Sequence, residues 1–305
     1  MKHFLTIDDT SADELRHVFD VAFRLRERRP HGNEPILRGQ TLAMIFEKPS
    51  LRTRVSFEQA MVELGGHAIV LDPQGVGLGV RESVADVTRV LNGMVHGIAA
   101  RVFEHSKLVE MADHASVPVV NMLSDDAHPC QALADIMTLM DEYGRDLTGR
   151  TIAWIGDGNN VARSLALICG KLGINFVIAA PGGYELGQAF IDHAMGMSPG
   201  MNFVEAEHPD DAVHDADAIF TDTWVSMGQE KEKAKRQRAF AAYQVNEALL
   251  AKAPKHAVVL HCLPAYRGSE ITDAVMDGPR SRVFPEAHNR LHAQKGLLAV
   301  LMGGE

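Results

Sequence analysis

The sequence predicts an α/β fold made of two open parallel-sheet domains. Short apolar runs alternate along the chain with longer segments whose apolar residues recur at helical spacing. Such alternation is typical of strand–helix–strand units, which build parallel sheets. The alternation pauses once, at the glycine-containing polar stretch GRDLTGR (144–150), and then restarts, so a domain boundary is expected there.

The first half of the chain contains four predicted strands, at 41–46, 67–72, 97–103 and 117–123. The segments between them, RVSFEQAMVELG, ESVADVTRVLNGM and SKLVEMADHA, have helical spacing, and a long helix is expected from about Gln131 to Tyr143. We therefore expect a first domain at 1–143.

The second half contains five predicted strands, at 151–156, 175–182, 201–206, 217–224 and 256–264, again with helical segments between them. They define a second domain at 150–285. The last segment, 286–305, is apolar at helical spacing and follows the final strand. It is predicted to form a C-terminal helix that crosses back onto the first domain.

Composition excludes several classes of protein. The chain has 305 residues and a formal net charge of -10, which argues against a broad nucleic-acid surface but leaves room for a small anionic ligand. Three cysteines without a CxxC pair indicate neither a disulfide framework nor a structural zinc site, so a reducing cytoplasm is the expected location. The apolar runs are too short for a membrane span, and the N-terminus lacks the apolar core of a secretion signal.

Polar residues follow the predicted strands at one edge of each sheet. Ligands of open parallel sheets bind beyond the carboxyl ends of the strands, where this chain has EKPSLRTR, SDDAHPCQ, GDGNN, DTWVSMG and CLPAYRG. Arg101 lies inside a predicted strand, where a charge is costly without an anionic partner. Ordinary polar loops would explain any one of these segments, but five on the same edges indicate ligand sites.

The segment EKPSLRTRVSFE (47–58) is locally basic in an acidic chain. A helix that begins near Ser50 would offer unpaired backbone N–H groups and the positive end of its dipole to an anion. The sequence therefore predicts a phosphate cradle here, although a capped helix with solvated arginines would show the same pattern. His128 and Gln131, three residues apart, would share a helix face and could donate to a carbonyl beside the phosphate.

Together with HPCQ, DTWVSMG and HCLPAYRG, this segment resembles the aspartate/ornithine carbamoyltransferase family, and its ornithine branch in particular. The likeness runs from about residue 3 to 302. It implies a carbamoyl phosphate site formed by Ser50, Leu51, Arg52, Thr53, Arg101, His128, Gln131, Cys262, Leu263 and Arg290. It implies an ornithine site formed by Asn160, Asp222, Ser226 and Met227.

The resemblance also implies an activity, namely transfer of a carbamoyl group from carbamoyl phosphate to the δ-amine of L-ornithine, giving citrulline and phosphate, most simply within arginine biosynthesis. Arg101, His128, Asp222 and Cys262 would carry the chemistry. A cytoplasmic homotrimer without metal or organic cofactor would be expected, with no nucleic-acid or membrane partner. Another amine, such as putrescine or an acylated ornithine, is the alternative acceptor.

The chain departs from the family pattern at two positions. Leu51 replaces a threonine common among relatives, which matters little if this position contributes its backbone N–H. Gly77 stands where many relatives carry a glutamine that contacts carbamoyl phosphate, so that contact is not carried over. Arg81 is a conceivable substitute within a loop rich in glycine.

Two other enzyme classes fit the motifs less well. A dinucleotide-binding fingerprint in TIAWIGDGNNV lacks its third glycine, where Val161 stands, and the next predicted strand ends without an acidic residue. A cysteine hydrolase would need a base for Cys262, but the adjacent His261 would point to the opposite face of its strand. His128 could still serve as that base. A binding protein without turnover is a further alternative, although the expected catalytic groups are present.

Overall fold

The computed structural model describes residues 1–32, 34–197, 201–226 and 228–305, with the side chains of 73 and 74 left out. The described residues form two compact units, one of 1–134 with 288–305 and one of 135–287. The division falls inside two helices, α6 (Pro129–Tyr143) and α13 (Val283–Gly303).

The first unit contains, in its described part, a four-stranded parallel sheet in the order β2-β1-β3-β4. Its strands are β1 (Thr41–Phe46), β2 (His67–Leu71), β3 (Gly97–Arg101) and β4 (Val119–Leu123). β1, β3 and β4 are buried along almost their whole length, as expected where helices cover both faces of a parallel sheet. β2, at the edge, stays half exposed.

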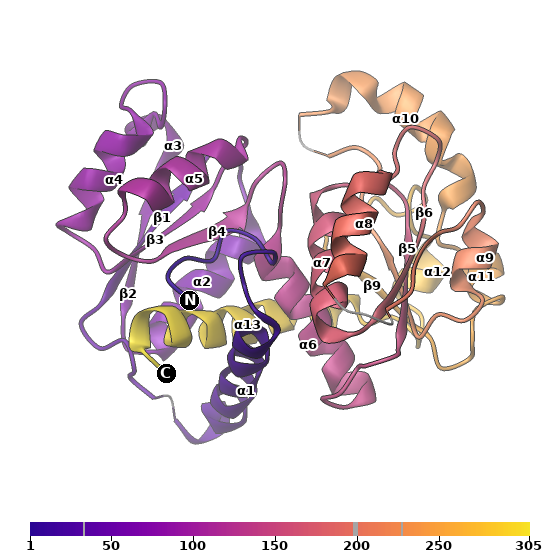
Figure 1. Ribbon diagram of the computed structural model, residues 1–305, viewed down its shortest axis with the longest axis horizontal. Helices are drawn as coiled ribbons and strands as arrows, with labels where there is room; N and C mark the ends of the chain where they lie inside the picture. The colour runs from indigo at the N-terminus through magenta and orange to yellow at the C-terminus, as the bar shows by residue number, and fades with distance from the viewer. Residues whose placement is uncertain (33, 198–200, 227) are drawn as a thin grey trace. The chain divides into compact units, whose positions relative to one another are not determined.

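Helices flank this sheet on both faces (Figure 1). They are α1 (Ala12–Arg28), α2 (Leu51–Glu63), α3 (Pro73–Val76), α4 (Val84–Asn92) and α5 (His105–His114), with the short 3-10 helix η1 (Arg29–His31) after α1. α1 begins at a capping box, in which Ser11 and Glu14 satisfy each other's backbone N–H groups.

The C-terminal helix packs against α1, as Figure 1 shows for the yellow and indigo helices. A Cβ built on Gly296 would lie 2.6 Å from Cβ of Ala22, so the two helices approach closely only because position 296 is glycine. The predicted return of the C-terminal helix to the first part of the chain is thereby confirmed.

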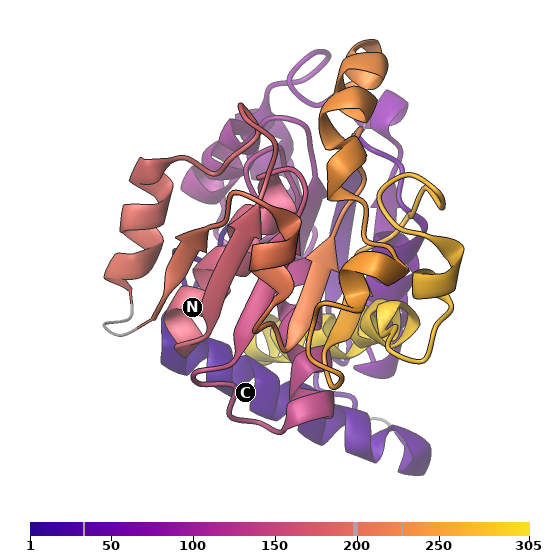
Figure 2. The ribbon, with the colours of Figure 1, turned by 90° about the vertical axis from the view of Figure 1, so that its right-hand side faces the viewer.

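The second unit contains, among its described residues, a five-stranded parallel sheet in the order β7-β6-β5-β8-β9 (Figure 2). Its strands are β5 (Thr151–Ile155), β6 (Asn175–Ala179), β7 (Phe203–Glu205), β8 (Ala218–Thr221) and β9 (Val258–His261). The helices are α7 (Asn160–Leu172), α8 (Gln188–Gly196), α9 (Pro209–Val213), α10 (Lys233–Phe240), α11 (Glu247–Leu250) and α12 (Asp273–Met276), with 3-10 turns η2 (Glu230–Glu232) and η3 (Ala241–Tyr243). The predicted α/β class with two parallel sheets is confirmed.

Several strands end earlier than the apolar pattern predicts. β8 and β9 pair only as far as Thr221 and His261, so Asp222 and Cys262 lie just beyond the sheet. Apolar character continues past the last paired residue because the turns at this edge are themselves partly buried. Asp222 and Cys262 therefore occupy turns and not strands, whereas Arg101 is the last residue of β3.

The segment EKEKAKRQR (230–238) mixes charges of both signs at helical spacing, a pattern typical of a solvated helix, but one of its arginines is buried. Arg236, on α10, is only 6% exposed, and its guanidinium donates to Asp157 Oδ2 at 2.8 Å and to the carbonyl of Trp224 at 3.1 Å. It also lies over the ring of Tyr184, 4.8 Å from the ring centroid. Arg236 thus ties the turn after β5 to the turn after β8. In the described parts of the chain, no helix has both the length and the apolarity of a membrane span.

Candidate active site

The predicted phosphate cradle forms at the start of α2, directly after β1. Ser50 caps this helix, and its hydroxyl accepts a hydrogen bond from the backbone N–H of Thr53 at 3.2 Å. Leu51 is 74% exposed, so its side chain points away from the packed face of α2. Its backbone N–H is what this residue can offer to a ligand at the helix start. The segment is therefore a capped helix, and its positive dipole end lies at the carboxyl edge of the sheet, where an anion would be stabilised.

Arg290, on α13, contacts the start of α2. Its guanidinium donates to Gln131 Oε1 at 2.6 Å and to Thr53 Oγ1 at 3.3 Å, and all three side chains are buried. The bond to Gln131 spans 159 positions in the sequence. Three residues assigned to carbamoyl phosphate by resemblance therefore meet in one hydrogen-bonded group within the first unit.

His128 lies among cations. Burial lowers the pKa of this imidazole well below its usual value, and the positive charges of Arg290, Arg101, Arg52 and Lys48 lower the pKa further. The histidine is therefore neutral at physiological pH, and a neutral imidazole can donate one hydrogen bond without adding charge. Four cations that act on one buried group create a field that favours an anionic ligand.

Lys48 belongs to this group, although the resemblance assigned it no site role. It is only 8% exposed, and its ammonium lies 4.4 Å from the ring centroid of Phe103. Burial lowers the pKa of Lys48, and the charge of Arg101 lowers the pKa further. The signal was present in the sequence, since Lys48 precedes the helix start in the locally basic segment.

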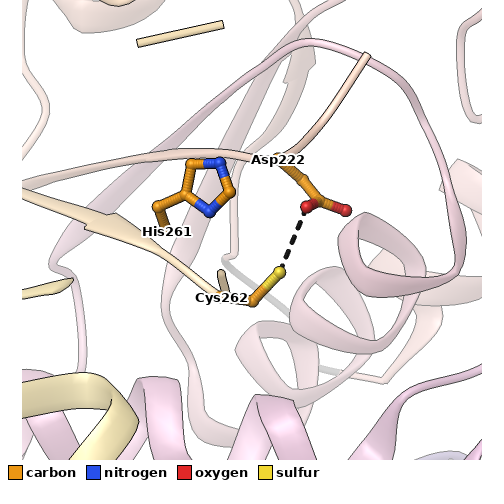
Figure 3. A group of neighbouring side chains, drawn as sticks. All are labelled: Asp222, His261 and Cys262. Carbon is orange, nitrogen blue, oxygen red and sulfur yellow. Dashed lines mark hydrogen bonds between the residues drawn. The ribbon is translucent and has the colours of Figure 1, made fainter. Parts of the chain in front are cut away.

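In the second unit, Asp222 is the centre of a smaller hydrogen-bond network at the carboxyl ends of β5, β8 and β9. One carboxylate oxygen accepts from Asn159 Nδ2 at 2.9 Å, and the other accepts from Cys262 Sγ at 3.1 Å and from the backbone N–H of Thr223 at 2.7 Å. Figure 3 shows the Asp222–Cys262 bond. Because Asp222 is buried, its carboxylate depends on these donors for solvation.

Cys262 is held as a thiol. Burial raises its pKa well above the usual value, and the neighbouring carboxylates of Asp222, Glu286 and Asp135 raise it further. A thiolate nucleophile needs the opposite environment, with a lowered pKa. The cysteine-hydrolase alternative is disfavoured on this ground.

His261 provides no base for that reaction either. Its Nδ1 accepts the backbone N–H of Leu263 at 2.9 Å. This places the proton on Nε2, which faces Glu270 Oε1 at 3.2 Å. Asp222, His261 and Cys262 are the one group of three potential metal ligands within the described ranges, with their ligand atoms within 4.8 Å (Figure 3). Because both ring nitrogens of His261 already have partners, these residues fit a metal poorly, and we assign none.

The remaining predicted residues lie as follows. Asn160 is the first residue of α7, but its neighbour Asn159 caps that helix and contacts Asp222. An N-cap asparagine that precedes an apolar helix could have been recognised in the sequence. The backbone N–H of Ser226 donates to Gln229 Oε1 at 3.0 Å, and Met227 lies outside the described residues.

Leu263 has a backbone φ of 58°, a conformation found in no other non-glycine residue of the described chain. The bond from its N–H to His261 holds this turn next to Cys262. Cys262 and Leu263 belong to the second unit, whereas the other residues assigned to carbamoyl phosphate belong to the first.

The fold and these two sites define an α/β protein with two parallel sheets. Buried cations at the carboxyl edge of the first sheet form a candidate site for an anion, and a carboxylate and a thiol lie at the carboxyl edge of the second. The chain belongs to the aspartate/ornithine carbamoyltransferase family: residues 2–141 match the family's carbamoyl-P binding domain, and residues 148–301 match its Asp/Orn binding domain.

Similarity to individual members of the family supports this assignment. Ornithine carbamoyltransferase from Anoxybacillus flavithermus is 48% identical over 304 residues, covering 99% of this chain and 96% of that protein. The solved ornithine carbamoyltransferase from Pyrococcus furiosus is 45% identical, with a TM-score of 0.96, and covers 100% of this chain and 98% of that one. A solved acetylornithine transcarbamylase complexed with acetylcitrulline is 31% identical, with a TM-score of 0.88 and 99% coverage of both chains.

Proposed function

We propose that this protein is an ornithine carbamoyltransferase that transfers the carbamoyl group of carbamoyl phosphate to the δ-amine of L-ornithine, with release of phosphate and a proton. The observation that carries the proposal is the full-length similarity to ornithine carbamoyltransferases, at 48% and 45% identity for the two proteins above. The lower identity to an acetylornithine transcarbamylase disfavours an acylated acceptor.

The chemistry of the first unit supports an anionic carbamoyl donor. Attack on the carbonyl of carbamoyl phosphate builds negative charge on its oxygen, and buried donors at that oxygen lower the barrier. Arg101, Thr53 and the neutral His128 are the donors that we assign to this task. Arg52, Arg290 and the start of α2 would bind the phosphate group, whose charge matches the surrounding cations.

The chemistry of the second unit supports an amine acceptor. The δ-amine of ornithine is protonated in neutral water, because such amines have a pKa of about 10. Asp222 would bind this ammonium, and the Cys262 thiol would help to orient the amine once its proton has left. Asn160, Ser226 and Met227 are proposed to hold the amino-acid end of ornithine, with Cys262 and Leu263 adding backbone contacts to the carbamoyl group.

The proposal includes assembly and location. We propose a cytoplasmic homotrimer that acts in arginine biosynthesis, with 1–143 as the carbamoyl phosphate domain, 150–285 as the ornithine domain and 286–305 as the returning helix. An exposed apolar stripe on α2 supports assembly, because Leu51, Val55 and Val62 lie at helical spacing and are all exposed. Light scattering of the purified protein, and of Val62→Glu, would measure the oligomeric state, with a monomeric Val62→Glu expected.

The decisive experiment compares acceptors. Purified protein is incubated with carbamoyl phosphate and, separately, with ornithine, acetylornithine, putrescine or aspartate, and the ureido product and phosphate are both quantified. Citrulline is expected selectively from ornithine, at a rate that rises from neutral to alkaline pH as the free amine becomes available. Preference for another amine, or no product with any of them, would contradict the proposal.

A further inference from the structure

Gln294 is a fully buried amide on α13, four residues after Arg290. Its oxygen accepts from Arg290 Nε at 3.0 Å and from Arg290 Nη2 at 2.9 Å. Its nitrogen donates to Ser56 Oγ at 2.5 Å and to the carbonyl of Arg290 at 3.2 Å. This is the amide orientation that satisfies both ends, since the opposite one turns the oxygen toward acceptors and the nitrogen toward donors.

The contacts of Gln294 continue into the start of α2. Ser56, which accepts from the Gln294 amide, donates its own hydroxyl proton to the carbonyl of Arg52 at 2.6 Å. Arg52 belongs to the first turn of the cradle helix. A continuous run of hydrogen bonds therefore joins the Arg290 guanidinium, through Gln294 and Ser56, to the helix turn that offers its backbone N–H groups to an anion.

Three acceptors that bind the Arg290 guanidinium have a common chemical character. Gln131 Oε1, Thr53 Oγ1 and the Gln294 amide oxygen are all neutral acceptors. A neutral acceptor orients a guanidinium without cancelling its charge, whereas a carboxylate would hold it more strongly and compete with a phosphate for it.

We propose that Gln294 is a positioning residue of the anion cradle, one that fixes Arg290 relative to the first turn of α2 while leaving its positive charge for the phosphate of carbamoyl phosphate. The inference rests on the proposed function and deepens it, because it assigns to Gln294 a role in carbamoyl phosphate affinity and none in ornithine affinity. Gln294 acts through Arg290 and Ser56 and need not contact the substrate.

The test is the substitution Gln294→Met, which keeps the length of the side chain and removes both hydrogen-bonding ends. Equilibrium binding of inorganic phosphate without ornithine is expected to weaken by about 10-fold or more, as is typical for a lost hydrogen bond to a charged group. The KM for carbamoyl phosphate should rise in parallel, while the KM for ornithine stays unchanged. Gln40→Met is the matched control, since Gln40 Nε2 donates to the carbonyl of Met302 at 3.2 Å, near the far end of the same helix.

Gln294→Glu tests the requirement for a neutral group. The carboxylate keeps an acceptor for Arg290, so a purely structural role predicts phosphate affinity closer to wild type than that of Gln294→Met. The proposed role predicts the reverse order, with Gln294→Glu binding phosphate more weakly than Gln294→Met, because the added negative charge opposes the ligand.

Ser56→Ala provides a second test in case the substitutions at position 294 impair folding. Alanine favours the helix, and this variant removes the hydroxyl that joins Gln294 to the carbonyl of Arg52 while leaving the Gln294–Arg290 contacts in place. A smaller loss of phosphate affinity is expected, and it should not add to that of Gln294→Met in the double variant. Wild-type phosphate affinity in both single variants would overturn the inference, whereas an unsubstituted protein that makes no citrulline would overturn the proposed function instead.

Discussion

The carboxyl edges of the two sheets each hold a buried titratable side chain surrounded by charges, and the sign of those charges differs between the two edges. At the first, burial and four cations lower the pKa of His128. At the second, burial and three carboxylates raise the pKa of Cys262. In both cases a titratable side chain is kept neutral by neighbours whose charge has the same sign as that of its own ionised form.

This comparison indicates that the neutral side chain, His128 or Cys262, and the charged residues around it have separate roles. Under the proposed function, the surroundings would attract a substrate group of opposite charge, a phosphate at the first edge and an ammonium at the second. The neutral imidazole and the neutral thiol donate hydrogen bonds without changing that charge. A histidine or a cysteine in a site is therefore not by itself a sign of proton transfer or of nucleophilic attack.

The largest effects are expected from removing the charge at each edge in turn. Arg101→Leu should reduce the rate by about 10² to 10³-fold and raise the KM for carbamoyl phosphate, because it removes a buried donor. Asp222→Asn should cause a loss of similar size while raising the KM for ornithine. Steady-state kinetics with each substrate varied separately would measure both effects. A higher KM for ornithine in Arg101→Leu, or for carbamoyl phosphate in Asp222→Asn, would contradict the separate roles of the two sites.

The next effect concerns His292, which also lies buried among cations on α13 but has no assigned site role. Burial, followed by the charges of Lys295, Arg26 and Arg29, lowers its pKa to about 4. Between about pH 6.5 and pH 4 the unfolded chain therefore binds a proton that the folded chain does not. The resulting stability is present above the unfolded pKa and is lost as the pH falls, by about 3 kcal/mol in all.

The substitution His292→Leu should flatten this part of the stability curve. Denaturant unfolding at a series of pH values would measure it, with His214→Leu, at an exposed position, as the control. A slope that is equal in both variants and in the unsubstituted protein would show that His292 is not the group responsible.

A smaller effect is expected in the reactivity of Cys262. Because its pKa is raised, iodoacetamide should modify it slowly at neutral pH. Asp222→Asn removes one of the carboxylates that raise this pKa, so modification should become several-fold faster, by up to about 10-fold for each pKa unit recovered. Mass spectrometry would locate the label, with Cys262→Ala as the blank. Rapid labelling of the unsubstituted protein at neutral pH would contradict the thiol assignment.

The smallest effect concerns Gly77, where the chain departs from many relatives. Its φ is +56°, and an added Cβ would lie 2.6 Å from Cβ of Arg81. Gly77→Ala should lower the unfolding free energy by roughly 1 kcal/mol or more. Gly39→Ala, with φ at +78° and open space around the added Cβ, should cost less. Equal losses in thermal or denaturant unfolding would show that the Arg81 contact does not restrict position 77.

The sequence alone was sufficient for the fold class and for the order of the strands, because local periodicity is carried by each segment itself. The sequence also led us to expect the return of the C-terminal helix, but its close contact with α1 depends on packing between Gly296 and Ala22. The resemblance also proposed a set of site residues. The structure adds two candidates to that set: Lys48, whose charge acts on His128, and Asn159, which donates a hydrogen bond to Asp222.

The partners of the buried polar groups were decided by the tertiary structure. Lys295 pairs with Glu63 at 2.8 Å across 232 positions, and Arg290 reaches Gln131 across 159. Arg236, which its own segment predicts to be solvated, is buried against Asp157. No local pattern encodes such pairs, because a buried charge takes its partner from whichever segments the packing brings within hydrogen-bonding distance. The sequence by itself determined which groups are present and where the elements lie, and packing decided which of those groups meet.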